Sequence, residues 1–424
     1  MLQRLFWIWL LLSFGAYNLF GQVVTGNLIE SIEFEGLKKT KSSFLEDYIL
    51  ATPGTNPNDS LLQLDVQRLK NLTGIGQAAY RIDTLNGALK LVFDIEEVKT
   101  LLPIINFGGI QNNIWFRLGF TDINWMGRGQ TLSSAYQYND RLHSGIIYFR
   151  VPRIRGSPWG GSLSIMRWAS REPLFFDEGT VNYDYTNTSF GFTTIRNFGY
   201  NRKLEAGGNF FIENYTKSEE QFLENPPGPD EATQPKILTK LEYAEDFINY
   251  HFFYLDGFSW QATGQNVYST KDKVWFNSLI LKGHQYLMLG KTSNFAFRQV
   301  LGISSNEDSP FAPFVADSYV NLRGVGNRID RGTAQFVLNT EYRQTIFHNK
   351  WALQAVAFSD FCTWRNPGGQ LEDLFDPDQF RLFVGGGIRL IYPKVYGAVL
   401  RIDYGVGVFD SESRGFVIGF GQYF

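Results

Sequence analysis

Residues 380–392 read FRLFVGGGIRLIY and residues 399–408 read VLRIDYGVGV. In both stretches apolar side chains take every second position, while arginine, aspartate and glycine take most of the positions between them. Successive side chains of a strand point to opposite faces, so each stretch predicts a strand with one apolar and one polar face. This pattern is typical of a transmembrane β-barrel with lipid outside and water inside, whereas a soluble sandwich packs its apolar face under a second sheet.

The chain from residue 100 onward repeats this alternation, and we expect an all-β transmembrane barrel of about 16 antiparallel strands over residues 100–424. Aromatic residues make up 16% of the chain and charged residues 19%, with 42 glycines. This composition suits aromatic girdles outside the barrel and small residues facing its lumen. Short and long connections alternate along the barrel, which predicts that both termini lie on the periplasmic side of the outer membrane.

Several other classes of protein do not fit. The net charge is -3 and no basic stripe is present, so we expect no nucleic-acid partner. The four histidines are scattered and match no catalytic or metal-binding spacing, so we expect no enzyme, no metal site and no cofactor. Cys362 is the only cysteine, which excludes an intramolecular disulfide.

Two segments precede the expected barrel. Residues 1–22 contain Arg4 and an apolar run over 5–12, which is typical of a secretory signal peptide, although an uncleaved helical anchor fits the same pattern. Residues 23–99 predict a small α+β domain with a strand over 28–35, two short helices and two strands. The pair Asn86-Gly87 predicts a tight hairpin between the last two strands.

The element order of residues 23–99 resembles a polypeptide-transport-associated (POTRA) domain. The resemblance rests on GLKKTK at 36–41, FLEDYIL at 44–50 and LVFDIEE at 91–97. It implies one periplasmic domain that receives polypeptides. A generic plug or capping domain is the other interpretation of the same order.

The barrel segment resembles the BamA/TamA-like outer-membrane assembly and transport barrels, the bacterial surface antigen family. TDINWMGRGQTLS at 121–133 resembles their strand-turn-strand signature, and FRVPRI at 149–154 resembles a strand that ends in proline. NLRGVG at 321–326 resembles their Arg-Gly motif, which lies on a loop that folds back into the lumen. The aromatic residue that usually follows Arg-Gly is Val325 here, so the usual aromatic contact is not expected.

An arginine confined in a lumen is best bound by carboxylates, because its planar guanidinium can form paired charge-assisted hydrogen bonds. Glu341 and Asp360 have the inward parity of neighbouring strands. We therefore expect Arg323 to dock against Asp360 with Glu341 nearby, while Gly324 lets the backbone pass close to the wall. The alternative is that Arg323 is a solvated loop residue. The motif neighbours are Leu322, Val325 and Gly326.

The first and last strands, expected as PIINFGGIQ at 103–111 and GFVIGFGQYF at 415–424, must meet to close a barrel, and both sequences favour a weak seam. Proline lacks a backbone donor and glycine adds no side-chain packing, so a seam built from them can open sideways. By resemblance, such a seam pairs with a client strand. The predicted seam residues are Pro103, Gly108, Gly109, Gly419, Gly421 and Phe424.

Together these observations predict an outer-membrane factor that inserts or translocates client polypeptides through a periplasmic domain and a lateral seam. The expected partners are outer-membrane lipids and unfolded clients, with periplasmic chaperones or accessory lipoproteins as further candidates. The alternative is a passive diffusion channel or structural barrel that handles no clients. Two-partner secretion pores are also similar, but they usually carry two such domains and a plug helix.

Overall fold

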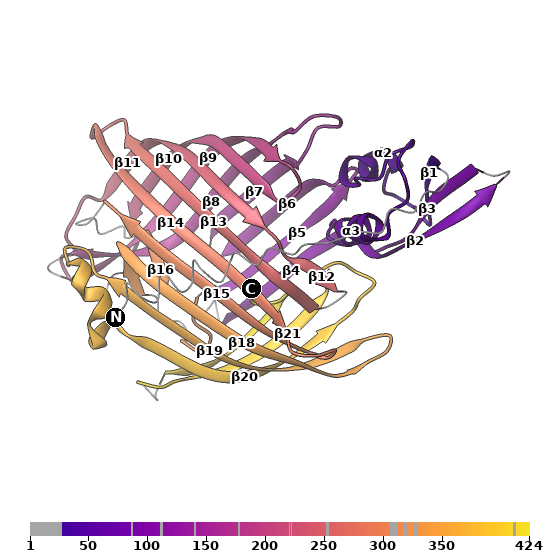
Figure 1. Cartoon of the computed structure of the whole chain (residues 1–424). Coiled ribbons are helices and arrows are strands. Elements are labelled where there is room, and N and C mark those ends of the chain that lie inside the picture. The colour runs from indigo at the N-terminus through magenta and orange to yellow at the C-terminus, as the bar shows by residue number, and fades with distance from the viewer. Residues whose placement is uncertain are drawn as a thin grey trace.

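The computed structural model shows a small N-terminal domain beside one end of a large β-barrel (Figure 1). The expected signal peptide, the hairpin tip Asn86-Gly87 and the motif residue Gly326 lie outside the described residues. The structure describes residues 28–424 except 86–87, 111–112, 140, 177–178, 220, 222, 252–253, 306–312, 317–320, 326–329 and 410–412.

The N-terminal domain has the order strand, helix, helix, strand, strand, with one 3-10 turn between the helices. Its three-stranded sheet has the order β1-β3-β2, with β1 parallel and β2 antiparallel to the central strand. The small α+β domain expected from the sequence is therefore present. Its elements are β1 (Ile29–Glu35), α2 (Ser42–Leu45), η1 (Glu46–Tyr48), α3 (Asp59–Lys70), β2 (Ile75–Leu85) and β3 (Ala88–Glu97).

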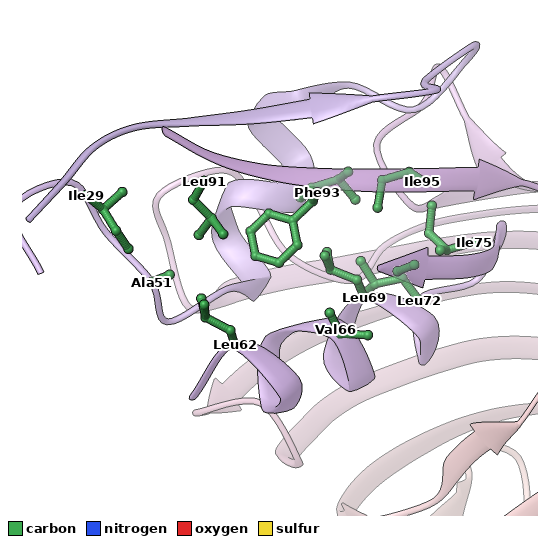
Figure 2. Packing of buried hydrophobic residues seen from close by; sticks show 12 residues of the cluster. Ile29, Ala51, Leu62, Val66, Leu69, Leu72, Ile75, Leu91, Phe93 and Ile95 are labelled. Carbon is green, nitrogen blue, oxygen red and sulfur yellow. The ribbon is translucent and has the colours of Figure 1, made fainter. Parts of the chain in front are cut away.

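The core of this domain forms between α3 and one face of the sheet (Figure 2). Leu62 and Leu69 on the helix and Leu91 and Phe93 on the central strand are almost fully buried. Their spacing puts the helical residues on one stripe and the strand residues on one face, so their burial supplies most of the domain's hydrophobic stabilisation. Asn58 caps the helix by accepting hydrogen bonds from the backbone N–H groups of two first-turn residues.

The barrel is an antiparallel ladder in which each wall strand lies beside the next wall strand along the chain; β16 and β17 form a separate sheet, so β15 is followed by β18. Its strands are β4 (Leu101–Ile110), β5 (Asn113–Trp125), β6 (Gln130–Asn139), β7 (Leu142–Val151), β8 (Trp159–Phe176), β9 (Gly179–Phe198), β10 (Arg202–Lys217), β11 (Glu231–Asp246), β12 (Asn249–His251), β13 (Tyr254–Ser269), β14 (Val274–Met288), β15 (Ser293–Ser304), β18 (Ala334–His348), β19 (Ala352–Arg365), β20 (Arg381–Ile391), β21 (Val399–Gly407) and β22 (Arg414–Phe420).

Within the described residues the ladder has seventeen strands, one of which is the three-residue β12 that extends the pairing on β13. The expectation of an antiparallel barrel with about 16 strands is confirmed. The strand order returns from β22 to β4. A residue-by-residue register is defined between β4 and β5 and at each later step to β22, but among the described residues none is defined between β22 and β4.

The polarity of the wall follows the alternation seen in the sequence. Val384 and Ile388 on β20 are exposed on the outside, whereas Arg389 on the same strand and Asp403 on β21 are buried inside. No described helix is long and apolar enough to cross a membrane. The far end of the barrel, away from the N-terminal domain, carries the 3-10 turns η2 (Leu371–Phe375) and η3 (Pro377–Gln379).

The last strand differs from the expectation. The sequence predicts a strand that continues to Phe424, but β22 ends at Phe420. Gly421 has φ +84, a conformation that glycine adopts without strain and that breaks the strand. We call residues 422–424 the C-terminal tail.

Candidate functional site

The long connection between β15 and β18 returns into the barrel, where Leu322, Arg323 and Val325 are buried. Two short strands, β16 (Phe314–Ala316) and β17 (Asp330–Gly332), pair on this connection. The apolar side chains on either side of the arginine pack against the barrel wall, which draws the arginine between them into the lumen. They join an apolar cluster with Val300, Ala316, Val337, Cys362, Trp364 and Phe383.

Asp360 on β19 accepts three hydrogen bonds from Arg323. The backbone N and Nε both donate to Oδ2 at 2.9 Å, and Nη2 donates to Oδ1 at 2.9 Å. The two side-chain bonds form the paired geometry that a guanidinium and a carboxylate favour. Asn339 Nδ2 donates to Asp360 Oδ1 and to the backbone O of Asn321, both at 2.8 Å, so it connects the carboxylate to the loop.

Two further carboxylates surround the same arginine. Glu341 on β18 accepts a hydrogen bond from Arg323 Nη1, from Arg343 Nε at 2.7 Å and from Arg389 Nη2 at 3.4 Å. Asp403 on β21 accepts from Arg389 Nη1 at 2.6 Å, and its Oδ2 lies 3.8 Å from Arg323 Nη1. The loop arginine is thus bound by carboxylates from three strands.

We call Arg323, Glu341, Asp360, Arg389 and Asp403 the lumen cluster. All five are 0% exposed. An ion buried without a partner costs several kcal/mol, so each member depends on the others. The interlocked pairs therefore favour one position of the loop inside the barrel.

Two aromatic rings lie against the guanidinium of Arg323. The Arg323 Cζ lies 3.7 Å from the ring centroid of Phe358 on β19 and 4.4 Å from that of Tyr423 in the C-terminal tail. Val325, which takes the aromatic position of the motif, instead packs in the apolar cluster at 4% exposure. The ring contacts to the arginine therefore come from outside the motif.

A family model described as the Omp85 superfamily domain matches residues 124–424. The chain belongs to the Omp85 superfamily. The match covers the barrel from the end of β5 to the C-terminal tail, including the loop and the lumen cluster. In a direct sequence comparison with curated proteins, no match is found.

Solved structures of similar fold agree with this Omp85 assignment. CdiB from Escherichia coli is 10% identical with a TM-score of 0.59 and covers 93% of this chain and 75% of its own. CdiB from Acinetobacter baumannii is 14% identical with a TM-score of 0.57, and the match covers 93% of this chain and 73% of the CdiB chain. BamA from Haemophilus ducreyi lacking POTRA domains 1-3 is 14% identical with a TM-score of 0.53, and the match covers 92% of this chain and 83% of the BamA chain. Identities this low establish the shared fold, an outer-membrane β-barrel, and nothing finer.

Sequence reasoning on this Omp85 chain missed several members of the site. Arg389 and Asp403 were recognised as inward-facing, but nothing indicated that they meet the loop arginine. Charged residues of opposite sign on the inward faces of adjacent strands were the available signal, because inward charges need partners. Tyr423 could not be placed, since the tail was expected to continue the last strand.

The predicted seam residues fall into two groups. Pro103, Gly108 and Gly109 lie on β4 and Gly419 lies on β22. Gly421 and Phe424 lie beyond the last strand, and Arg343 Nη2 donates to the backbone O of Phe424 at 2.9 Å inside the barrel. Phe424 therefore belongs with the tail that turns inward.

The strand-turn-strand signature of this Omp85 chain contacts the N-terminal domain. Lys39 Nζ donates to Asp122 Oδ2 at 2.6 Å, and Asn124 Nδ2 donates to Thr40 Oγ1 at 2.9 Å. A Cβ on Gly127 would lie 1.9 Å from the backbone O of Lys39, so only glycine fits there. We call these five residues the domain junction. These contacts explain why the signature contains an aspartate, an asparagine and a glycine at these positions.

No group of histidine, cysteine, aspartate and glutamate side chains suited to a metal ion is present among the described residues. The candidate site is therefore a set of ion pairs and ring contacts, whose chemistry is to hold a loop and a strand in place.

Proposed function

We propose that this chain is an outer-membrane protein insertion or translocation factor that receives client polypeptides at its N-terminal domain and releases them through a lateral seam between β4 and β22. The domain would act in the periplasm as a POTRA domain, and the chain would work without catalysis. Its partners would be unfolded clients and outer-membrane lipids, with chaperones or accessory lipoproteins as further partners.

The exposure of the last strand carries this proposal. Phe416, Ile418 and Phe420 on the outside of β22 are exposed by 71%, 69% and 73%, whereas the outward Leu400 and Tyr404 of β21 are exposed by 36% each. A side chain inside a continuous wall is covered by neighbours on both sides. β4 lies beside β22 in the closed order of the barrel, yet the outward side chains of β22 are less covered than those of β21. This supports a weakly covered flank, and a strand whose flank becomes free can pair with another strand.

A second region of contact between the N-terminal domain and the barrel, separate from the domain junction, supports the route that we propose for clients. A cavity of about 320 Å³ lies there, lined by Leu72 and Ile75 of the domain and by Tyr286, Tyr396 and Phe424 of the barrel. Aromatic and aliphatic walls suit the apolar side chains of an unfolded polypeptide. A client bound here would contact the domain and the tail of the last strand at once.

Depletion of the protein from its native cells tests the proposal. We expect particular outer-membrane or secreted proteins to decrease, and expression of the full chain to restore them. A chain lacking residues 23–97 should still form a barrel and restore them poorly. If all outer-membrane and secreted proteins keep their levels while purified protein conducts ions steadily in planar bilayers, the passive channel replaces this proposal.

A further inference from the structure

We propose that the C-terminal tail is an internal latch, in which Tyr423 positions Arg323 and so couples the returning loop to the last strand. The inference rests on the proposed seam between β22 and β4, and it names the group that controls that seam. The residues that form the latch, 422–424, lie outside the loop motif and beyond the end of β22.

The tail reaches the lumen because the last strand ends abruptly. Gly421 adopts φ +84, and its backbone N still donates to the backbone O of Val399 at 2.8 Å. The turn is thus anchored to β21 while the next three residues leave the wall. The tail can turn away from the wall at this position because the residue is glycine, since residues with a Cβ rarely adopt this φ.

Tyr423 lies between two arginines. Its ring centroid is 4.4 Å from Arg323 Cζ and 4.7 Å from Arg401 Cζ. Arginine cations stack favourably on aromatic faces, and the attraction is stronger away from water. One ring therefore contacts both the loop and the strand β21 that pairs with β22.

The side chain of Arg401 makes this ring important. It is only 8% exposed, and among the described residues its Nε and Nη1 have no hydrogen-bond partner. A Cβ on Gly419 would lie 2.8 Å from Nε, so the guanidinium passes directly over the backbone of β22. Removing the ring of Tyr423 would take away a main stabilising contact of a buried cation and would free it to move against the last strand.

The residues on either side of Tyr423 hold the ring in place. Gln422 Oε1 accepts a hydrogen bond from Arg389 Nε at 3.3 Å, and the backbone O of Phe424 accepts one from Arg343 Nη2 at 2.9 Å. Arg389 and Arg343 also donate to Glu341 of the lumen cluster. All three tail residues thus contact arginines that bind the loop or its carboxylates.

This geometry couples two events. Withdrawal of the tail removes one ring from Arg323 and two acceptors from the arginines around Glu341, so the loop loses contacts when the last strand moves. Conversely, displacement of Arg323 removes a contact of Tyr423, so the last strand loses one of its inner anchors when the loop moves. The latch therefore predicts that loop release and seam opening occur together.

Paired measurements on purified full-length protein in lipid vesicles test the coupling. With Cys362 replaced by alanine, loop release is measured as maleimide labelling of a cysteine at Val325. Seam opening is measured as slower disulfide formation between cysteines at Ile105 and Ile418, because this disulfide requires β4 and β22 to be adjacent. Tyr423→Leu should raise the labelling rate about tenfold and lower the rate of disulfide formation about tenfold, the size expected for a buried cation–ring contact. Tyr423→Phe, which keeps the ring, should leave both within about twofold.

Phe416→Leu is the matched control, because it removes an exposed ring from the outside of the same strand. It should leave loop labelling unchanged. In the double variant Arg323→Lys with Tyr423→Leu, the increase should be smaller than the product of the two single increases, because both act on one contact.

The latch is overturned if Tyr423→Leu changes one rate and not the other, or if Tyr423→Phe behaves as Tyr423→Leu does. If Tyr423→Leu and the unbranched Tyr423→Met both fail to fold while Tyr423→Phe folds, the ring has a structural role only, and the latch is also overturned. Neither readout involves a client, so the latch can fail while client handling stands, and client handling can fail while the coupling is measured.

Discussion

Gly324 on the loop and Gly405 on β21 meet backbone to backbone inside the barrel. A Cβ added to Gly324 would lie 2.6 Å from the carbonyl C of Gly405, and one added to Gly405 would lie 2.3 Å from the backbone O of Arg323. Both distances are too short for any real contact. The loop can therefore place Arg323 against the wall only because both contacting residues, Gly324 and Gly405, lack side chains.

Gly324→Ala should therefore release the loop. The residue has φ +100, which strains any residue with a Cβ, and the added methyl collides with the backbone of β21. We expect a loss of about 2–4 kcal/mol in the free energy of unfolding, from strain and overpacking together. The measurement is unfolding of the purified barrel in urea, together with protease cleavage of the loop.

Gly368→Ala separates the two causes. Gly368 also has a positive φ, +77, but nothing lies within 4 Å of an added Cβ. We expect only the cost of the backbone, about 1–2 kcal/mol, and no change in loop cleavage. Equal effects of the two alanines would contradict the close approach of loop and wall.

Arg323→Ala should destabilise the barrel by about 3–5 kcal/mol, because it leaves Asp360 buried without its arginine and removes one of the three arginines that bind Glu341. Arg323→Lys retains the charge but not the paired hydrogen bonds, so its loss should be smaller. Arg414→Ala, which removes an exposed arginine from β22, is the control and should change little. Heat-induced unfolding followed by gel mobility measures all three, and equal stability of Arg323→Ala and the native chain would refute the docking.

The alternation of apolar and polar residues was enough to predict the barrel and the inward side of each strand. The parity of Glu341 and Asp360 indicated which carboxylates could face the lumen. Parity could not indicate height along the barrel, so it could not say that Asp403 and Arg389 lie level with Arg323. That level depends on the stagger of neighbouring strands, which is set by pairing across the whole sheet.

The C-terminal tail marks another limit of sequence reasoning. Gln422, Tyr423 and Phe424 follow a strand pattern without a break, and glycine occurs within other strands of this barrel. The strand breaks at Gly421, which has a positive φ, but residue type does not reveal this, since Gly257 also has a positive φ and lies within β13. Conformation at one residue decides whether the tail continues the wall or enters the lumen, and composition does not reveal it.

Lys39→Met should loosen the N-terminal domain from the barrel. Lys39 Nζ donates to Asp122 at 2.6 Å and to Thr100 Oγ1 at 3.1 Å, and Asp122 is almost fully buried. The lysine is partly exposed, so we expect a loss of about 1 kcal/mol in docking. Faster hydrogen exchange at the turn that contains Gly127 would report it.

Lys38→Met is the matched control, since Lys38 is an exposed lysine one residue away. Its exchange pattern should match that of the native chain. If both lysine variants change exchange at the turn equally, general surface charge and not the ion pair holds the junction.

Acid should release the segment 38–40 of the N-terminal domain, because Glu97 binds its backbone. Its carboxylate accepts hydrogen bonds from the backbone N–H groups of Lys38, Lys39 and Thr40 at 2.8 to 3.1 Å. Burial acts to raise the pKa of Glu97, but these hydrogen bonds outweigh it and hold the pKa below its ordinary value. The stabilisation is therefore present above about pH 4.3, the unfolded pKa, and is lost as the pH falls through the folded pKa.

Glu97→Gln should mimic the acid state at neutral pH, because the neutral amide lacks the charge that strengthens these hydrogen bonds and its nitrogen cannot accept the one from Lys39 to Oε2. We expect Glu97→Gln to show faster exchange of the three N–H groups at pH 7 and a smaller further loss of domain stability on acidification than the native chain. An acid response as large as that of the native chain would assign the pH dependence to another group.

Crosslinking of the seam in living cells tests the central claim most directly. Cysteine at Ile105 on β4 is combined in turn with cysteine at Phe416, Ile418 or Phe420 on β22, in a chain with Cys362→Ala, and client proteins are compared between oxidised and reduced cells. A cysteine pair at Ile105 and Leu118, which face each other across the β4–β5 ladder, is the control because it crosslinks the wall without the seam. We predict that oxidation stops the accumulation of clients when the cysteines join β4 to β22, and not when they join β4 to β5. Normal accumulation with a fully formed seam crosslink would contradict it.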